Sequence, residues 1–139
     1  MASSNNEPRD TESRERERAR QSKWKAGKFD YQRLDVYKVA RQALLLGEKI
    51  SKQLPRGYGK LRDQLRRALL STYLNIAEAA SRTGNDRRCR FRCSRGEAAE
   101  AAAAVEAIEL LQLAPPQQTD ELTALLARCC AMLTRLAQR

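Results

Sequence analysis

The sequence predicts an all-α protein: an up-and-down antiparallel four-helix bundle that carries a disordered charged N-terminal tail and assembles as a ring oligomer. Its 139 residues are about one domain's worth of chain. Hydrophobic residues make up 42% of it and aromatic residues only 5%, so the apolar surface comes mainly from Ala and Leu, which are good helix formers. Apolar side chains also recur at spacings of three and four, the period of an amphipathic helix.

Two segments differ in composition, a charged tail over 1–28 and a bundle over 29–139. Apart from Trp24 and a few alanines, the tail has almost no apolar side chain, so it cannot repay the conformational entropy lost on folding. Alternating acidic and basic residues at 14–20 place opposite charges one turn apart, the pattern of a transient helix. We expect the tail to be a solubilising leader, with a specific binding role as the alternative.

Four helices account for the apolar pattern after the tail. Pro55 ends the first helix, and Pro115 and Pro116 end the third. Thr119 begins the fourth, because acidic residues follow it in the first turn. The predicted helices are, in chain order, about 34–54, 60–81, 87–113 and 119–136. The connections between them are short, which favours antiparallel neighbours.

The second predicted helix has apolar side chains on two opposite faces. One face packs in the bundle core, and the other most simply packs against another subunit, because a helix that is apolar nearly all round is not left in water. The residues assigned to this oligomer interface are Leu70, Tyr73, Leu74 and Ala77. A basic middle and an acidic C-terminal part of the chain favour a head-to-tail contact, which closes into a ring.

Charge is the strongest compositional signal. The chain has 27 Lys and Arg against 17 Asp and Glu, and residues 49–95 hold 13 of the basic and 3 of the acidic side chains. Such an excess favours a polyanionic partner, RNA or DNA. The chain has no histidine, which removes the commonest general acid or base, so we expect no enzyme. The absence of a signal peptide and of a long apolar run predicts a cytoplasmic protein without membrane contact.

Five arginines lie close together at the start of the third predicted helix. The helix dipole disfavours them there, so local stability does not explain them. Their planar forks suit phosphate, and no base-reading motif accompanies them, so contacts should be to the nucleic-acid backbone. The residues assigned to nucleic-acid binding are Arg87, Arg88, Arg90, Arg92 and Arg95, extended by Lys60, Arg62 and Arg66. The alternative is a solvated basic face, or ion pairs between subunits with Glu97, Glu100, Glu106 and Glu109.

A polar strip runs between the two apolar faces of the second predicted helix. Its members are Arg67, Ser71, Asn75 and Glu78. Groups in such a strip must be satisfied internally, which predicts a hydrogen-bonded ladder that fixes helix register or the subunit joint. The alternative is a site for a small polar ligand.

The four cysteines do not have the spacing of a metal site. Cys89 and Cys93 are one turn apart, Cys129 and Cys130 are adjacent, and no Cys-x-x-Cys pair or histidine completes a zinc set. We expect all four to be reduced and to serve as small apolar side chains. We assign no catalytic residue, metal or cofactor, since the sequence has no phosphate loop, nucleophile elbow or metal-binding helix motif.

The segment 64–79, QLRRALLSTYLNIAEA, resembles the signature of bacterial four-helix bundle proteins encoded in intervening sequences of 23S ribosomal RNA genes. Its Asn-Ile-Ala-Glu core at 75–78 is the most specific piece, and the stretches 34–37 and 95–96 are similar to the pattern of that family. The resemblance covers about residues 29–139. Ala79 and Glu97 depart from it, since the family usually has Gly and Ser at these places.

This resemblance implies a homopentameric ring with a positively charged surface and no catalytic activity. The same fold serves as the accessory variability determinant of diversity-generating retroelements, a basic pentamer that binds nucleic acid and the reverse transcriptase. We therefore expect a non-enzymatic protein that binds RNA or DNA through phosphate contacts, as an accessory factor to an enzyme such as a reverse transcriptase. The alternative is a structural ring whose basic face binds an acidic protein partner.

Overall fold

The structure, a computed structural model, describes residues 11–19 and 29–139. These ranges contain helices and no strand, which confirms the all-α prediction. Residues 11–19 are helical and all exposed, and the rest of the predicted tail over 1–28 lies outside the described residues. The elements of 29–139 are the 3-10 helix η1 (Asp30–Arg33) and the α-helices α2 (Asp35–Gln53), α3 (Gly59–Ala80), α4 (Gly84–Leu110) and α5 (Pro116–Ala137).

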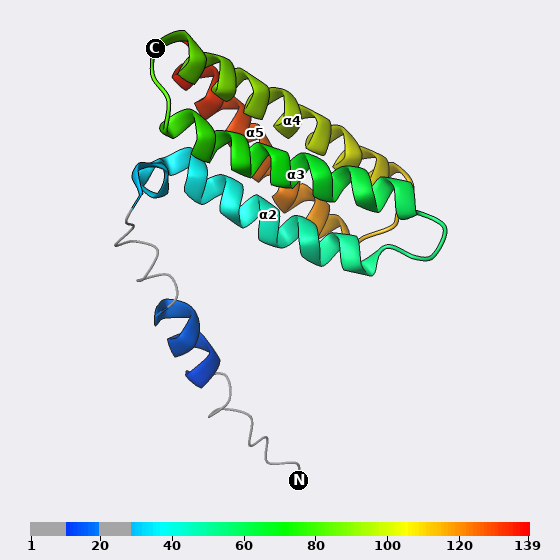
Figure 1. The fold of residues 1–139 in the computed structure, drawn as a ribbon. Helices are drawn as coiled ribbons and strands as arrows, with labels where there is room; N and C mark the ends of the chain where they lie inside the picture. The colour runs from blue at the N-terminus through cyan, green and yellow to red at the C-terminus, as the bar shows by residue number, and fades with distance from the viewer. Residues whose placement is uncertain (1–10, 20–28) are drawn as a thin grey trace.

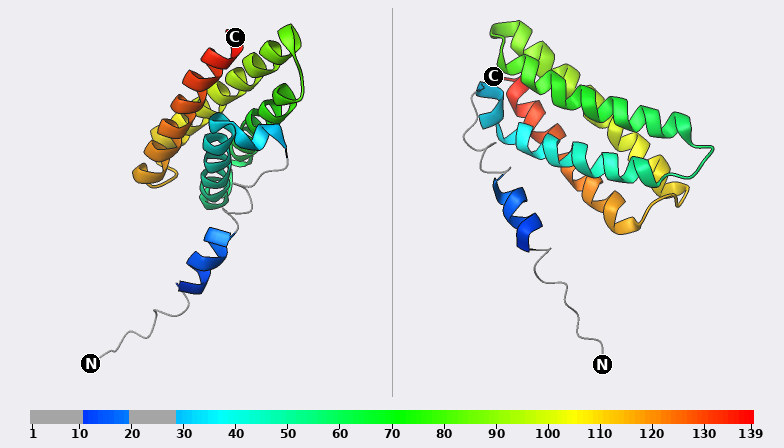
Figure 2. Two further views of the ribbon diagram at one scale, coloured as in Figure 1. Left: turned by 90° about the vertical axis from the view of Figure 1, so that its left-hand side faces the viewer. Right: turned by 60° about the horizontal axis from the view of Figure 1, so that its bottom comes forward.

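Helices α2 to α5 pack side by side as a helical bundle around one core (Figure 1). Each contacts its neighbours in the order α2, α3, α4, α5 and back to α2, whereas no Cα atoms of the diagonal pairs, α2 with α4 and α3 with α5, lie within 8 Å of each other. Successive helices run in opposite directions, as the two further views in Figure 2 also show. The helix over 11–19 and η1, which contacts α2 and α3, are additional to the four helices that the apolar pattern predicts.

The core is built from one face of each helix. In α3 the apolar spacing predicts an inward stripe at positions 61, 65, 68, 69, 72, 76 and 79. The last six of these are buried, Leu65, Ala68, Leu69, Thr72, Ile76 and Ala79, and Leu61 is half-buried. Phe91 and Ile108 of α4 and Leu126 of α5 are fully buried against the same core. The apolar period of α3 is therefore a reliable guide to its inward face.

Helices α2 and α3 approach closely at Gly47. A Cβ atom added to this glycine would lie 2.0 Å from Cδ1 of Leu69 on α3. Real Cβ contacts are never that short, so the buried Leu69 side chain occupies the space that a larger residue at 47 would need. The missing side chain at position 47 leaves the space that the Leu69 side chain of α3 fills.

Two helix ends differ from their predicted positions. Helix α4 begins at Gly84, within the stretch predicted as a turn, because glycine accepts the positive φ of 60° that the chain adopts there. Helix α5 begins at Pro116 and not at Thr119, since proline is well suited to the first turn of a helix. Thr119 is instead buried inside the helix, where its hydroxyl donates a hydrogen bond to the Pro116 carbonyl at 3.1 Å.

Gly47→Ala and Gly96→Ala make the same change in two helices and should have opposite effects on stability. Replacing Gly by Ala in a helix is by itself worth about 0.5–1 kcal/mol. At Gly96 nothing lies within 4 Å of an added Cβ, so the free energy of unfolding should rise by about that amount. At Gly47 overpacking costs about 1–3 kcal/mol, so we expect a net loss of about 1 kcal/mol. Urea denaturation measures both, and equal stabilisation by the two changes would contradict the close packing of α2 on α3.

Candidate nucleic-acid interface

The arginine run lies in the first three turns of α4, at the end of the bundle where α3 ends. We use "arginine run" for Arg87, Arg88, Arg90, Arg92 and Arg95. Phe91 is buried in the middle of the run and holds this part of α4 on the core. The guanidinium of Arg87 lies over the Phe91 ring, 5.1 Å from its centroid, which is a cation–π contact.

The members of the arginine run have few acidic partners. Arg92 and Arg95 are exposed, and neither forms an ion pair or a hydrogen bond with a residue that the structure describes. Arg88 donates hydrogen bonds to the side-chain oxygen of Asn85 and, at 3.0 Å, to the backbone carbonyl of Arg139. The Asn85 acceptor is an uncharged amide oxygen. Arg90 is the exception, with a long 3.7 Å ion pair to Glu78.

The acidic residues next to the run are already paired with arginines of α3 and its C-terminal turn. Arg67 lies 2.5 Å from Glu100 and 3.3 Å from Glu97, and its hydrogen bond to Glu100 is the main cause that raises the pKa of Arg67. Glu97 and Glu100, which the alternative interpretation pairs with arginines of another subunit, form ion pairs with Arg67 of the same chain. This pairing leaves the arginine run without those two carboxylates.

Arg82 forms ion pairs with two acidic side chains where α3 ends and α4 begins. Its guanidinium lies 2.6 Å from Asp86 and 2.8 Å from Glu78, and the hydrogen bond to Asp86 is the first cause that raises the pKa of Arg82. Glu78 is shared with Arg90 of the run at the longer distance of 3.7 Å. The end of the bundle that holds the run is therefore strongly positive.

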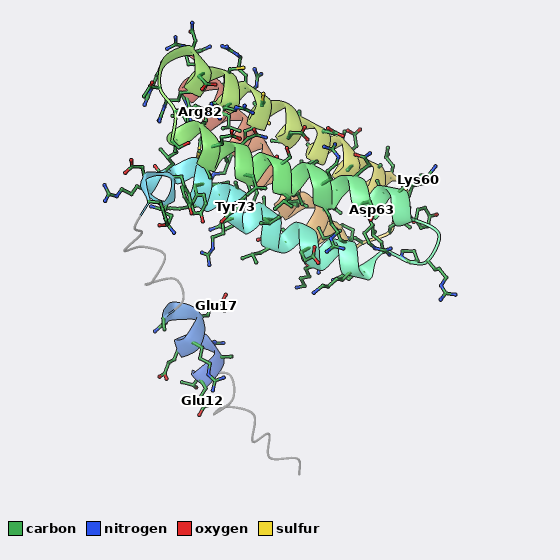
Figure 3. The ribbon with its side chains drawn as sticks, in the orientation of Figure 1. Glu12, Glu17, Lys60, Asp63, Tyr73 and Arg82 are labelled. Carbon is green, nitrogen blue, oxygen red and sulfur yellow. The ribbon has the colours of Figure 1, made fainter. Side chains whose placement is uncertain are left out.

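The three predicted extensions of the nucleic-acid site do not join the run. Lys60 and Arg82 lie at opposite ends of the bundle in Figure 3, and the 22-residue helix α3 separates them. Arg66 forms a 3.0 Å ion pair with Glu48 of α2. Lys60 is exposed and forms no ion pair with a described residue. The arginine run and the residues predicted to extend it therefore do not form one continuous basic patch on the single chain.

Arg62 has a structural role that the sequence did not indicate. Its guanidinium donates hydrogen bonds to the carbonyl of Ser51 at 3.0 Å and of Leu54 at 2.8 Å. These carbonyls lie at the C-terminal end of α2, where backbone acceptors lack partners inside the helix and a positive charge is favourable. We therefore remove Arg62 from the nucleic-acid site.

The predicted polar ladder on α3 divides into separate contacts. The Asn75 amide donates to the backbone carbonyl of Ser71 at 2.9 Å and to its hydroxyl at 3.1 Å. Arg67 and Glu78 instead pair with other residues, Arg67 with two glutamates of α4 and Glu78 with Arg82 and Arg90. The strip therefore helps to set the position of α4 on α3, but its four members do not form one ladder.

Of the four residues predicted to form the oligomer interface, two are exposed in the single chain and two are half-buried. Tyr73 is half-buried, and its hydroxyl hydrogen bonds to the buried Tyr37 hydroxyl at 2.6 Å. Burial is the main cause that raises the pKa of Tyr37 above its ordinary value. Leu70 and Leu74 remain 47% and 53% exposed, and Ala77 is half-buried. A further leucine that the sequence analysis missed, Leu45 of α2, is 62% exposed.

The cysteines fall into two classes, which corrects the expectation that all four serve as small apolar side chains. Cys129 is buried and Cys130 is half-buried, and burial raises the pKa of Cys129 to about 12. Cys89 and Cys93 are exposed on α4, so they are not core residues. Among the described residues, no group of three or more His, Cys, Asp or Glu side chains is placed to hold a metal ion.

The comparison with protein families gives one match. The model described as 23S rRNA-intervening sequence protein matches residues 32–135, which include α2, α3, α4 and most of α5. None of the curated proteins matches the chain. In the part of the chain that the structure describes, every helix is too short or too polar to cross a membrane.

Arg62→Met tests the capping role of Arg62. The substitution keeps most of the apolar stem and removes both hydrogen bonds to the end of α2, so the free energy of unfolding should fall by about 1–3 kcal/mol. Lys60→Met is the matched control, because an exposed side chain without such contacts should change the same quantity by no more than about 0.5 kcal/mol. Urea denaturation of the two variants decides the point, and equally small effects would mean that Arg62 does not cap α2.

Proposed function

Because the chain belongs to the 23S rRNA-intervening sequence protein family, we propose that it is a non-enzymatic protein that binds RNA or DNA through the arginine run of α4. The binding is to phosphate groups and depends little on base sequence. In its most specific form, the proposal makes the protein an accessory factor of a nucleic-acid enzyme such as a reverse transcriptase. That last step follows from the family resemblance.

One observation carries the proposal: among the residues that the structure describes, Arg90 is the one member of the arginine run that pairs with a carboxylate side chain, at the long distance of 3.7 Å. The nearest carboxylates pair with Arg67 and Arg82, which are not members of the run. Neighbouring like charges on a helix repel each other, and the helix dipole adds to this cost near the N-terminus of α4. A polyanion that neutralises the arginines removes this repulsion and releases counterions when it binds.

The geometry of the run fits a phosphate backbone. Arg88, Arg92 and Arg95 are spaced by four and three residues, so they lie along one side of α4. A guanidinium donates two parallel hydrogen bonds to a phosphate, and side chains one turn apart can contact successive phosphates. Arg88 is already oriented by its contacts to Asn85 and Arg139, and Arg92 and Arg95 are free to adjust.

We further propose that the protein forms a homo-oligomeric ring through the outer face of α3. Leu70 and Leu74 are large apolar side chains that the single chain leaves exposed, as it does Leu45 of α2. Exposed apolar surface of this kind is typical of protein interfaces. A ring, five-membered as the family resemblance implies, presents several arginine runs to one nucleic acid and multiplies their weak contacts by avidity.

Arg92→Gln with Arg95→Gln tests the assignment of the run. The double variant should bind a single- or double-stranded oligonucleotide more weakly, and the slope of log K against log salt should fall by about two, one for each lost phosphate contact. Fluorescence anisotropy over a salt series measures both quantities.

The matched control for this test is Lys52→Gln with Arg56→Gln, which removes the same charge at the other end of the bundle. We expect the control to keep nearly the slope of the natural sequence. Equal losses in the two variants would mean that only total charge matters. If nuclease-treated protein retains an acidic protein partner and the purified chain binds no oligonucleotide, the protein-scaffold alternative replaces the proposal.

Leu70→Glu with Leu74→Glu tests the interface on α3. The buried charges would not be tolerated in a subunit contact, so the variant should elute as a helical monomer. Leu110→Glu with Leu111→Glu is the control, because these leucines are also exposed, at 75% and 52%, but lie at the C-terminal end of α4. Light scattering gives the masses and circular dichroism the helicity. A double Leu70 and Leu74 variant that keeps the mass of the unchanged protein would exclude this face.

A further inference from the structure

Two exposed thiols lie inside the arginine run, and the proposed function makes no use of them. Cys89 stands between Arg88 and Arg90, and Cys93 follows Arg92. Both cysteines are exposed, whereas the other two in the chain are buried or half-buried in α5. Because four residues separate them, the two thiols lie on the same side of α4, about one turn apart.

We propose that Cys89 and Cys93 are a modification site for anionic disulfides, with glutathione disulfide as the chemical class, and that the adduct weakens phosphate binding by the arginine run. The modification chemistry depends only on the exposed thiols and their charged surroundings. The effect on nucleic acid rests on the proposed function.

The surroundings of the two thiols favour an anionic reagent. Arginines flank both cysteines along the helix, and the adjacent carboxylates are paired with Arg67 and Arg82. Glutathione disulfide carries more carboxylates than ammonium groups and is an anion at neutral pH. A positive surface raises the local concentration of anions, and such electrostatic focusing accelerates association by about 10- to 1,000-fold at low salt.

The geometry of α4 directs the two thiols to an external partner and not to each other. Cβ atoms four residues apart on a helix are about 5–6 Å apart, whereas a disulfide requires about 3.5–4.5 Å. Closing a bond between Cys89 and Cys93 would therefore unwind the part of α4 that Phe91 and Ser94 hold in the core. An external disulfide meets no such restriction, because both thiols face solvent.

The reaction is an ordinary thiol–disulfide exchange. The cysteine thiol loses its proton to water, and the thiolate sulfur attacks one sulfur of glutathione disulfide. The S–S bond of the reagent breaks as the new S–S bond to the protein forms, and one glutathione leaves as a thiolate that takes up a proton. No separate oxidant is needed, and an excess of free thiol reverses the step.

The adduct should act on binding by charge and by bulk. Each glutathionyl group brings net negative charge to a site that attracts phosphate, so it opposes the arginines beside it. It also lies against the guanidinium groups that would contact the nucleic acid. The fold is not expected to change, because neither thiol packs in the core.

The first test compares the rates at which the full chain reacts with two aromatic disulfides, one dicarboxylate and one uncharged. At low salt the ratio of the anionic to the neutral rate constant should be at least about tenfold higher than at high salt. Arg92→Gln with Arg95→Gln should lose most of this difference, and Lys52→Gln with Arg56→Gln should keep it. Peptide mass spectrometry should place the adducts on Cys89 and Cys93. A ratio that salt and both variants leave unchanged would overturn the modification site.

The second test follows oligonucleotide binding before and after treatment with glutathione disulfide. We expect at least about a tenfold loss of affinity at low salt, restored by reductant and absent in the Cys89→Ser, Cys93→Ser double variant. Modified protein with unchanged affinity would overturn the regulatory part of the proposal. If the untreated protein binds no oligonucleotide, the proposed function fails, while the rate measurement still decides whether the thiols are a site for anionic disulfides.

Discussion

The contact between α3 and α4 determines how the charge of this protein is distributed. At its buried centre the Ser94 hydroxyl donates a hydrogen bond to the Thr72 carbonyl at 2.7 Å. On either side of this bond, Arg67 and Arg82 form ion pairs with the neighbouring carboxylates. Exposed ion pairs of this kind contribute little stability, so their main effect is on the surface field. They leave the arginines of α4 facing solvent without carboxylates to neutralise most of them.

Much of the fold could be predicted from the apolar period alone. The inward stripe of α3, Leu65 to Ala79, is buried as its spacing predicts, because one face of a 3.6-residue helix must meet the core. The helix ends were less predictable. Gly84 and Pro116 both have the composition of a turn or stop signal, but Gly84 enters α4 with a positive φ and proline fits the first turn of a helix.

The candidate site could be predicted only in part, because charge in a sequence does not reveal pairing in space. Arg62 lies eight and eleven residues from the two carbonyls it caps, and Arg66 meets Glu48 across a helix contact, so neither role follows from local spacing. The exposure of Cys89 and Cys93 could have been predicted from their helical spacing. Counted from the buried Phe91, both fall on the side of α4 opposite the core.

The arginine run has a cost for the free protein, and this cost connects folding with binding. Its like charges repel one another on a helix whose dipole already disfavours them, so the buried Phe91 within the run and the buried alanines further along α4 must hold the helix in place. Any anion that binds the native run and not the unfolded chain lowers the free energy of the folded state. The positive field that attracts phosphate also attracts an anionic disulfide to thiols in the same turns. Binding and modification therefore compete for the same charge, and a single change in the pairing of the nearby carboxylates would alter both.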